Sequence, residues 1–159
     1  MTLNEFFPSL LQNNFGMLKM TVADLSDADL LVRPVTSANH ANWQLGHLLV
    51  AEHSLVSGCK LAMPELPAGF AARYSKKTVG VDDPGQLAAK AELMALFEKV
   101  RTASAEHASN LPGERWQEKG PAAFTPTIAS MFEALLGHVA MHVGQLQVIR
   151  RKLGKPILF

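Results

Sequence analysis

Hydrophobic residues recur at helical spacing near the C-terminus of the chain. Their positions there are Ile128, Met131, Phe132, Leu135, Val139, Leu146, Ile149 and Leu153. This pattern predicts one long helix that begins at Thr125-Pro126, where a capping residue precedes a proline, and ends at Gly154. Two histidines, His138 and His142, lie within or beside the apolar stripe. Residues four apart share a face of a helix, so we expect both imidazoles to point toward the core.

The N-terminal segment, residues 2–25, predicts a first helix. Thr2 and Glu5 have the spacing of a capping box, in which each side chain pairs with the backbone N–H of the other residue. Apolar residues then recur every three or four positions, with Pro8 as the weak point, because proline inside a helix removes a backbone hydrogen bond. We expect Pro8 to lie within the first two turns or to bend the helix.

A second helix is predicted from Ser37 or Asn39 to Gly58. One of its faces carries Trp43, His47, Val50 and Ser54. That face is mostly apolar, so we expect Trp43 to pack in the core and His47 to lie on the same side of the helix.

The third helix has the clearest start signal in the chain, with Asp83 as N-cap and Pro84 as first residue. It should continue to about Ser104 or His107. Its pattern is formed by Leu87, Ala91, Met94, Phe97, Val100 and Arg101. Four amphipathic helices and no alternating strand pattern favour an all-α four-helix bundle, with residues 1–159 as a single domain.

Two connections, residues 59–82 and 109–124, are long and irregular. Loops of this length are usually functional or mobile, so we expect both to form walls of a substrate pocket. Cys59 is the only cysteine of the chain, which excludes an intramolecular disulfide and a zinc module with several cysteines. We expect Cys59 to be a small buried residue in a reduced, cytoplasmic protein.

Charge and hydropathy exclude further classes of partner. The net charge is +1 and the basic residues form no long run, so we expect no nucleic-acid partner. No apolar stretch approaches the roughly 20 residues that a membrane-spanning helix requires, and we expect no membrane partner. The N-terminus lacks the basic and apolar regions of a signal peptide. A small-molecule substrate remains the expected partner.

The histidine pair on the last helix offers two nitrogens, which is half of a transition-metal site. Catalytic sites commonly use a third protein ligand and keep one position open. The candidates for that third ligand are His40, His47, His53 and His107. We prefer His47 because it shares a face with Trp43, whereas His53 lies about 120° away around the helix. Three neutral imidazoles would leave a divalent ion its full charge, which favours a bound water or thiolate.

No convincing catalytic carboxylate accompanies these histidines. We expect both Glu52 and Glu133 to be solvated, and Gln145 either supplies a hydrogen bond behind His142 or is incidental. A histidine on an apolar face is also commonly satisfied by a core hydrogen bond. The alternative is therefore a non-catalytic helical bundle that serves dimerisation or binding. Haem ligation by a bundle histidine is a third possibility.

Two motifs, one on each histidine-bearing helix, are distinctive when taken together. They are Asn42-Trp43-Gln44-Leu45-Gly46-His47-Leu48 and Gly137-His138-Val139-Ala140-Met141-His142-Val143-Gly144-Gln145-Leu146. Together they resemble the DinB/YfiT-like metalloenzyme family. The resemblance implies a four-helix bundle whose divalent metal ion, usually zinc or nickel, is bound at one end of the bundle by His47, His138 and His142. It also implies a homodimer.

Characterised members of that family include thiol-dependent S-transferases and an isomerase that use low-molecular-weight thiols. The resemblance therefore implies a metal-dependent enzyme with a low-molecular-weight thiol as a second cofactor. The expected reaction is S-transfer to a small molecule, or hydrolysis if the open metal position holds a hydroxide.

Overall fold

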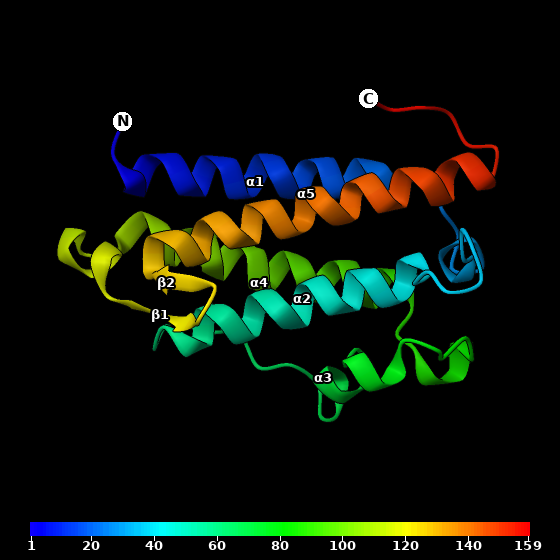
Figure 1. The fold of residues 1–159 in the computed structure, drawn as a ribbon, viewed down its shortest axis with the longest axis horizontal. Helices are drawn as coiled ribbons and strands as arrows, with labels where there is room; N and C mark the ends of the chain where they lie inside the picture. The colour runs from blue at the N-terminus through cyan, green and yellow to red at the C-terminus, as the bar shows by residue number, and fades with distance from the viewer.

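The computed structural model describes residues 1–159 and is mainly helical, as predicted (Figure 1). Its α-helices are α1 (Leu3–Val22), α2 (Ala41–Gly58), α3 (Phe70–Arg73), α4 (Lys90–Asn110) and α5 (Ile128–Lys152). Four short 3-10 helices, η1 to η4, span Asp29–Leu31, Lys76–Thr78, Pro84–Gln86 and Gly113–Gln117. The two strands are β1 (Lys119–Ala122) and β2 (Thr125–Thr127).

The four long helices pack side by side. Helix α1 contacts α4 and α5, and α2 contacts the same two helices. In Figure 1, α1 and α5 lie together along the upper side of the molecule, α2 and α4 lie below them, and α3 lies outside α2. The arrangement confirms the predicted all-α four-helix bundle.

The apolar faces of the helices meet in two buried clusters. In the larger cluster, Phe15 of α1 packs on Phe97 of α4, with ring centres 5.1 Å apart. In the smaller one, Phe7 of α1 stacks on Trp116 of η4 at 5.3 Å. Both clusters also contain residues of α2 and α5, such as Leu48 and Leu146 in the larger one and Val56 and Leu135 in the smaller one. Burying a large apolar side chain contributes about 1.5–3 kcal/mol, so the two clusters supply much of the stability that holds these helices in place. Cys59 is buried as expected.

Helix α1 begins where the sequence predicts. The Thr2 N–H donates to Oε2 of Glu5 at 2.8 Å, as a capping box requires. Pro8 lies inside the helix, in its second turn. The helix ends at Val22, slightly before the predicted Leu25.

The predicted start of the third helix at Asp83-Pro84 is wrong. Asp83 caps only the short turn η3, and α4 begins later, at Lys90, whose N–H donates to the distant carboxylate of Asp27 at 2.6 Å. Between them, Ala88 is held in extended buried chain by Tyr74 and α2: its N–H donates to the Tyr74 hydroxyl, and its carbonyl accepts from the Asn42 amide, both at 2.8 Å. These tertiary contacts override the local capping signal.

The predicted start of the last helix at Thr125-Pro126 is also wrong. These residues belong to β2, which pairs antiparallel with β1, and the N-cap of α5 is Thr127, whose hydroxyl accepts from Ser130 N–H at 3.1 Å. A Cβ at Gly120 of β1 would lie 1.9 Å from the Thr125 carbonyl oxygen, so the hairpin requires glycine there. The helix ends at Lys152 with Leu153 as C-cap, and Gly154 follows it as predicted, with a φ of +69° that favours glycine.

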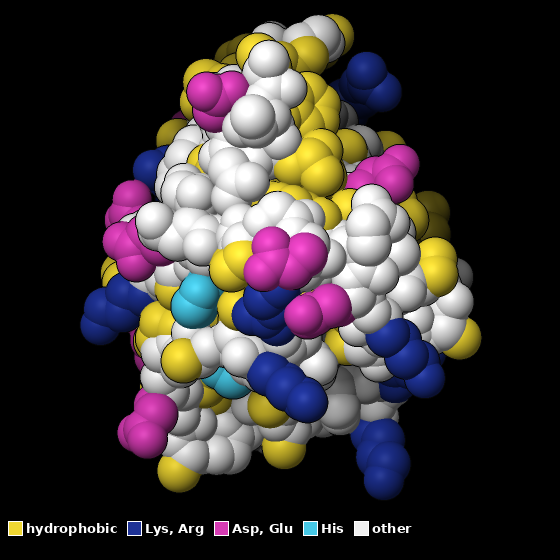
Figure 2. Space-filling view, turned by 90° about the vertical axis from the view of Figure 1, so that its left-hand side faces the viewer, with side chains coloured by type: hydrophobic (Ala, Val, Ile, Leu, Met, Phe, Trp, Pro, Cys, Tyr) yellow, Lys and Arg dark blue, Asp and Glu magenta, His cyan; other side chains and the backbone are white.

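None of the helices is both long and apolar enough to cross a membrane. Figure 2 shows the end of the bundle that faces left in Figure 1. Acidic and basic side chains are interspersed there rather than gathered by sign, in keeping with the net charge of +1.

Candidate metal centre

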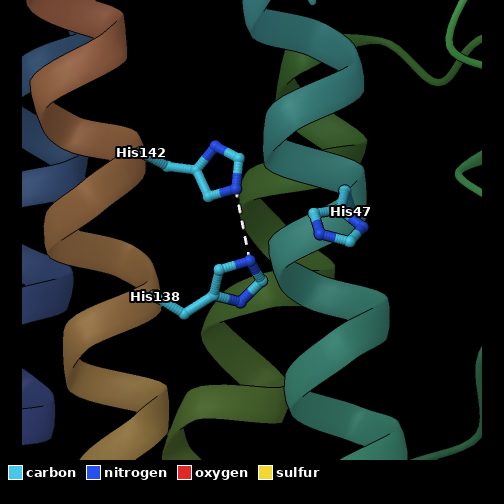
Figure 3. A group of neighbouring side chains, drawn as sticks. All are labelled: His47, His138 and His142. Atoms are coloured by element: carbon cyan, nitrogen blue, oxygen red, sulfur yellow. Dashed lines mark hydrogen bonds between the residues drawn. The ribbon is translucent and has the colours of Figure 1, made fainter. Parts of the chain in front are cut away.

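Three histidine side chains converge between α2 and α5 (Figure 3). His47 projects from α2, and His138 and His142 project from α5, one turn apart. The Nε2 atoms of His138 and His142 are 3.2 Å apart, and one nitrogen of each of the three residues lies within 4.8 Å of the others. The structure therefore brings together the three residues chosen from the sequence. They lie near the middle of α5, not at one end of the bundle as the resemblance implies.

The spacing of these nitrogens fits a tetrahedral ion. Zinc–nitrogen bonds of about 2.0–2.1 Å place two nitrogen ligands roughly 3.3 Å apart. The 3.2 Å separation within the α5 pair, His138 and His142, is close to that value. His47 lies somewhat farther away, with its ring centre 5.0 Å from that of His138 and 5.6 Å from that of His142. Three imidazoles could thus hold a divalent metal ion here.

Burial keeps the three imidazoles neutral. It lowers the pKa of His138 and of His142 to about 4, and neighbouring histidine charges add to the effect. Burial also lowers the pKa of His47, with a smaller contribution from the charge of Lys76. A neutral imidazole has a free lone pair, whereas a protonated one cannot bind a metal. All three side chains are therefore in the ligating form at pH 7.

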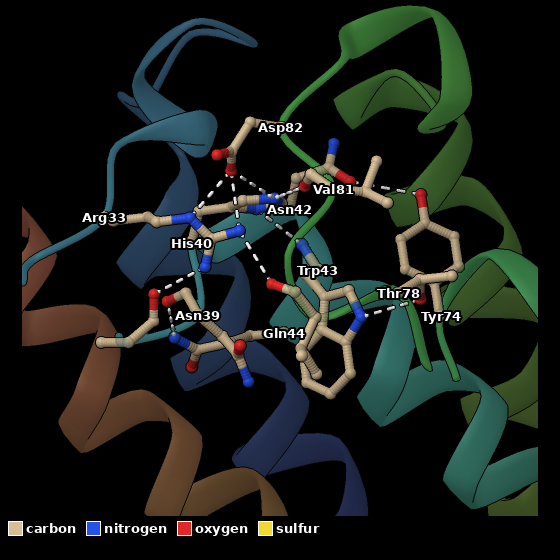
Figure 4. A network of polar contacts seen from close by, with 12 residues as sticks. Arg33, Asn39, His40, Asn42, Trp43, Gln44, Tyr74, Thr78, Val81 and Asp82 are labelled. Atoms are coloured by element: carbon tan, nitrogen blue, oxygen red, sulfur yellow. Dashed lines mark hydrogen bonds and ion pairs between the residues drawn. The ribbon is translucent and has the colours of Figure 1, made fainter. Parts of the chain in front are cut away.

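The buried side chain of Gln44 fixes the orientation of His142. Its Oε1 lies 2.8 Å from Nδ1 of His142. Its Nε2 donates to the Asn39 carbonyl, also at 2.8 Å (Figure 4). An amide oxygen only accepts, so Nδ1 of His142 must carry the proton and Nε2 must present its lone pair to His138. Gln145, the sequence-based candidate for this role, is exposed, and the hydrogen-bond partners of His142 are Gln44 and His138. The residue behind the ligand is therefore Gln44, which sequence reasoning missed.

Trp43 packs in the core as expected, and it also positions His47. The two rings stack with centres 4.8 Å apart and planes inclined by 9°. The indole Nε1 donates to the Thr78 hydroxyl at 3.2 Å, which ties the stack to η2 (Figure 4). One face of the His47 ring is therefore covered by an indole that is itself hydrogen-bonded to η2.

The other three histidines are engaged elsewhere. His40 is the N-cap of α2 and accepts from Trp43 N–H at 3.0 Å. His53 and His107 contact backbone carbonyls, at 3.0 Å and 2.6 Å respectively. None of the three belongs to the group formed by His47, His138 and His142.

One of the two carboxylates expected to be solvated is buried. Glu52 is 2% exposed and pairs with the equally buried Arg101 of α4, with Nη2 and Oε2 2.7 Å apart. The expectation for Glu52 is therefore wrong, because a charged partner on a neighbouring helix compensates its burial. Glu133 is exposed, as expected. Neither carboxylate joins the histidine cluster.

A pocket of about 530 Å³ opens beside the cluster. It is lined by His47, Ala51, Ser54, Leu55, Phe124, Ala134 and His138. Residues 109–124 contribute Phe124 to this pocket, and residues 59–82 contribute nothing. Of the two predicted walls, only the 109–124 loop therefore lines the pocket beside the histidines. The 59–82 segment instead lines a groove of about 730 Å³ beside His53, which meets the pocket at Ser54.

Comparison with known proteins identifies one family. A sequence model described as the DinB superfamily matches residues 10–146, which include all three histidines of the cluster. No curated protein matches the chain.

Proposed function

Because the chain belongs to the DinB superfamily, we propose that it is a metal-dependent enzyme whose divalent ion is held by His47, His138 and His142. The observation that carries the proposal is the convergence of three neutral imidazole nitrogens within 4.8 Å of one another. Two of these side chains line a pocket, so a small molecule can reach them. Imidazole ligands suit several transition metals, of which we propose zinc or nickel.

We propose thiol-dependent S-transfer as the reaction, with hydrolysis as the variant that uses water in place of the thiol. When bound, a divalent ion with three neutral ligands lowers the pKa of a coordinated thiol or water. In S-transfer the thiol sulfur forms a bond to an electrophilic carbon of the substrate, and the leaving group departs with the electron pair. The thiol proton passes to solvent, because no carboxylate lines the pocket.

The protein's own residues prepare the site for this chemistry. Gln44 holds the tautomer of His142 that leaves Nε2 free, and Trp43 restricts the ring of His47. The pocket beside the cluster has mainly apolar walls. Burial keeps the imidazoles unprotonated, so a metal does not compete with protons at neutral pH.

The second candidate is a non-catalytic bundle that serves dimerisation or binding. The contact between the Nε2 atoms of His138 and His142 favours it, because at 3.2 Å the two rings can satisfy each other by a hydrogen bond. The homodimer and the cytoplasmic location remain predictions under either function.

Metal content distinguishes the two candidates. The protein should be purified without a histidine tag and compared with its His47→Ala and His138→Ala variants by elemental analysis. We expect about one divalent ion per chain, lost in both variants and retained in His53→Ala, which removes a histidine outside the cluster whose Nε2 lies 3.0 Å from the Pro64 carbonyl oxygen. Wild-type protein that neither contains nor takes up zinc or nickel would establish the non-catalytic bundle instead. Activity that depends on added thiol then separates S-transfer from hydrolysis.

A further inference from the structure

The pocket beside the histidine cluster has a chemical character of its own. Apart from the two histidines, its only polar side chain is Ser54. The remaining walls are Ala51, Leu55, Phe124 and Ala134, and no lysine, arginine, aspartate or glutamate is among them. A pocket lined in this way gives a charged or sugar-like group little to bond with, whereas it removes an apolar group from water.

Phe124 is the large side chain of this wall. It lies in the turn between β1 and β2 and is 70% exposed, so it contributes little to the core. Such an exposed aromatic ring at the edge of a pocket is available to cover an apolar ligand, which would bury ring and ligand together.

The turn that carries Phe124 is well anchored. The fully buried hydroxyl of Thr125 accepts from Ala122 N–H and donates to the Ala122 carbonyl, both at 3.2 Å. Both strands of the hairpin pack on α5, and β1 also contacts α2. The pocket wall and the two histidine-bearing helices are therefore parts of one packed unit, which is how a specificity-determining side chain is usually supported.

We propose that this pocket binds the apolar, ring-sized body of a thiol next to the histidine cluster, and that Phe124 determines the preference for it. The inference rests on the proposed function, because it assumes that the bound molecule reaches a metal held by His47 and His138. It adds the chemical class: a small molecule with a metal-binding head and an apolar aliphatic or aromatic body. The pocket's volume of about 530 Å³ lies in the range of small-molecule sites and accommodates such a ring.

The test uses two thiols of similar acidity that differ in their bodies, phenylmethanethiol and 2-mercaptoethanol. Each is titrated into the cobalt(II)-loaded protein, and binding is followed by the thiolate-to-metal charge-transfer absorption in the near ultraviolet. We expect phenylmethanethiol to bind at least about tenfold more tightly, because its ring is removed from water by the pocket. Phe124→Ala should weaken phenylmethanethiol about five- to tenfold and leave 2-mercaptoethanol within about twofold.

Two variants keep the test specific to the pocket. Phe124→Leu retains an apolar side chain and should restore part of the preference. Phe6→Ala removes an aromatic ring that is also partly exposed, on α1 and not in the pocket wall, and should change neither affinity.

The outcomes separate this inference from the proposed function. Equal affinities of the two thiols in wild type, or no effect of Phe124→Ala on phenylmethanethiol, would overturn the inference and leave the metal site standing. Failure of the protein to bind cobalt would overturn both. Cobalt binding without a thiolate band from either thiol would overturn the inference and the thiol part of the proposed function.

Discussion

The contact between Gln44 and His142 allows a sharp prediction about metal affinity. Replacing Gln44 by leucine keeps a side chain of similar size in the buried position but removes the oxygen that accepts from Nδ1 of His142. The imidazole then loses the partner that selects its tautomer and holds its Nε2 toward His138. We expect the variant to fold and to bind zinc more weakly.

The size of the effect follows from the role of the hydrogen bond behind the ligand. Loss of a hydrogen-bonding partner behind a metal ligand typically costs 10- to 100-fold in affinity, or about 1.4–2.7 kcal/mol. Both side chains are buried, with Gln44 1% and His142 5% exposed, so water does not replace the lost acceptor. We therefore expect the Kd for zinc to rise about 10- to 100-fold.

The assay is competition for zinc with a chromophoric chelator at pH 7, on metal-free protein. Gln44→Glu retains an acceptor for His142 and should stay within about threefold of wild type, although it loses the donor to the Asn39 carbonyl. Gln147→Leu is the matched control, because Gln147 is a half-buried glutamine of α5 whose Nε2 has no hydrogen-bond partner. It should leave the affinity unchanged.

The reasoning is refuted if Gln44→Leu, shown to be folded by circular dichroism, binds zinc as tightly as wild type. It is also refuted if Gln147→Leu weakens binding as much as Gln44→Leu does, because the loss would then be a general effect of changing the core.

Three further predictions concern stability, measured as the free energy of unfolding in urea. Arg101→Met leaves the buried Glu52 carboxylate without its charged partner and should cost about 3–5 kcal/mol. The Glu52→Leu, Arg101→Met double variant should recover most of this loss. A loss below about 1 kcal/mol in Arg101→Met would contradict this prediction. Gly46→Ala would place a Cβ 2.2 Å from the Tyr74 ring and should cost about 1–3 kcal/mol. Gly144→Ala, which adds a Cβ in open space on α5, should gain about 0.5–1 kcal/mol. Stability changes of the same sign in the two variants would be inconsistent with the close contact of Gly46 with Tyr74. In metal-free protein the folded-state pKa of the α5 pair, about 4, lies below the ordinary value of 6.5, so the unfolded chain binds more protons between these values. The contribution of the pair to the free energy of unfolding is full above pH 6.5 and is lost as the pH falls toward 4. A variant with asparagine at both positions should lose this part of the pH dependence. An identical slope of unfolding free energy against pH in the two proteins would exclude the effect.

The parts of the fold that follow a helical period could be predicted from the sequence. The apolar stripe of α5 placed His138 and His142 on one buried face, and the position of His47 on the face of Trp43 identified it among four candidates. Both inferences depend only on residues within one helix, where a period of 3.6 residues determines which side chains lie together. The caps at Thr2 and Gly154 are local in the same sense.

The features that sequence reasoning missed are contacts between distant segments. Gln44 and His142 are 98 positions apart, and Glu52 and Arg101 belong to different helices. The sequence held a hint of each contact, because Gln44 lies three residues before His47 and Arg101 interrupts an apolar face. Neither hint identifies the residue that Gln44 or Arg101 binds, because a buried polar residue shows only that some compensating group must exist.

Sequence reasoning missed the hairpin and placed the start of α4 wrongly for a related reason. The strand Lys119–Ala122 has no alternation of polar and apolar residues, so nothing local predicts that it pairs with β2. At Asp83-Pro84 the local capping signal was good, yet the contacts of Ala88 with Tyr74 and Asn42 keep the chain extended for several more residues. Tertiary packing decided both segments.

The most direct test of the metal site is anomalous diffraction from crystals of the protein grown with one equivalent of zinc, with data collected at the zinc absorption edge. We predict a single strong peak between α2 and α5, about 2.0–2.1 Å from one nitrogen of each of His47, His138 and His142. No peak between these side chains, or a peak bound by other residues while the 3.2 Å contact within the α5 pair persists, would contradict the account.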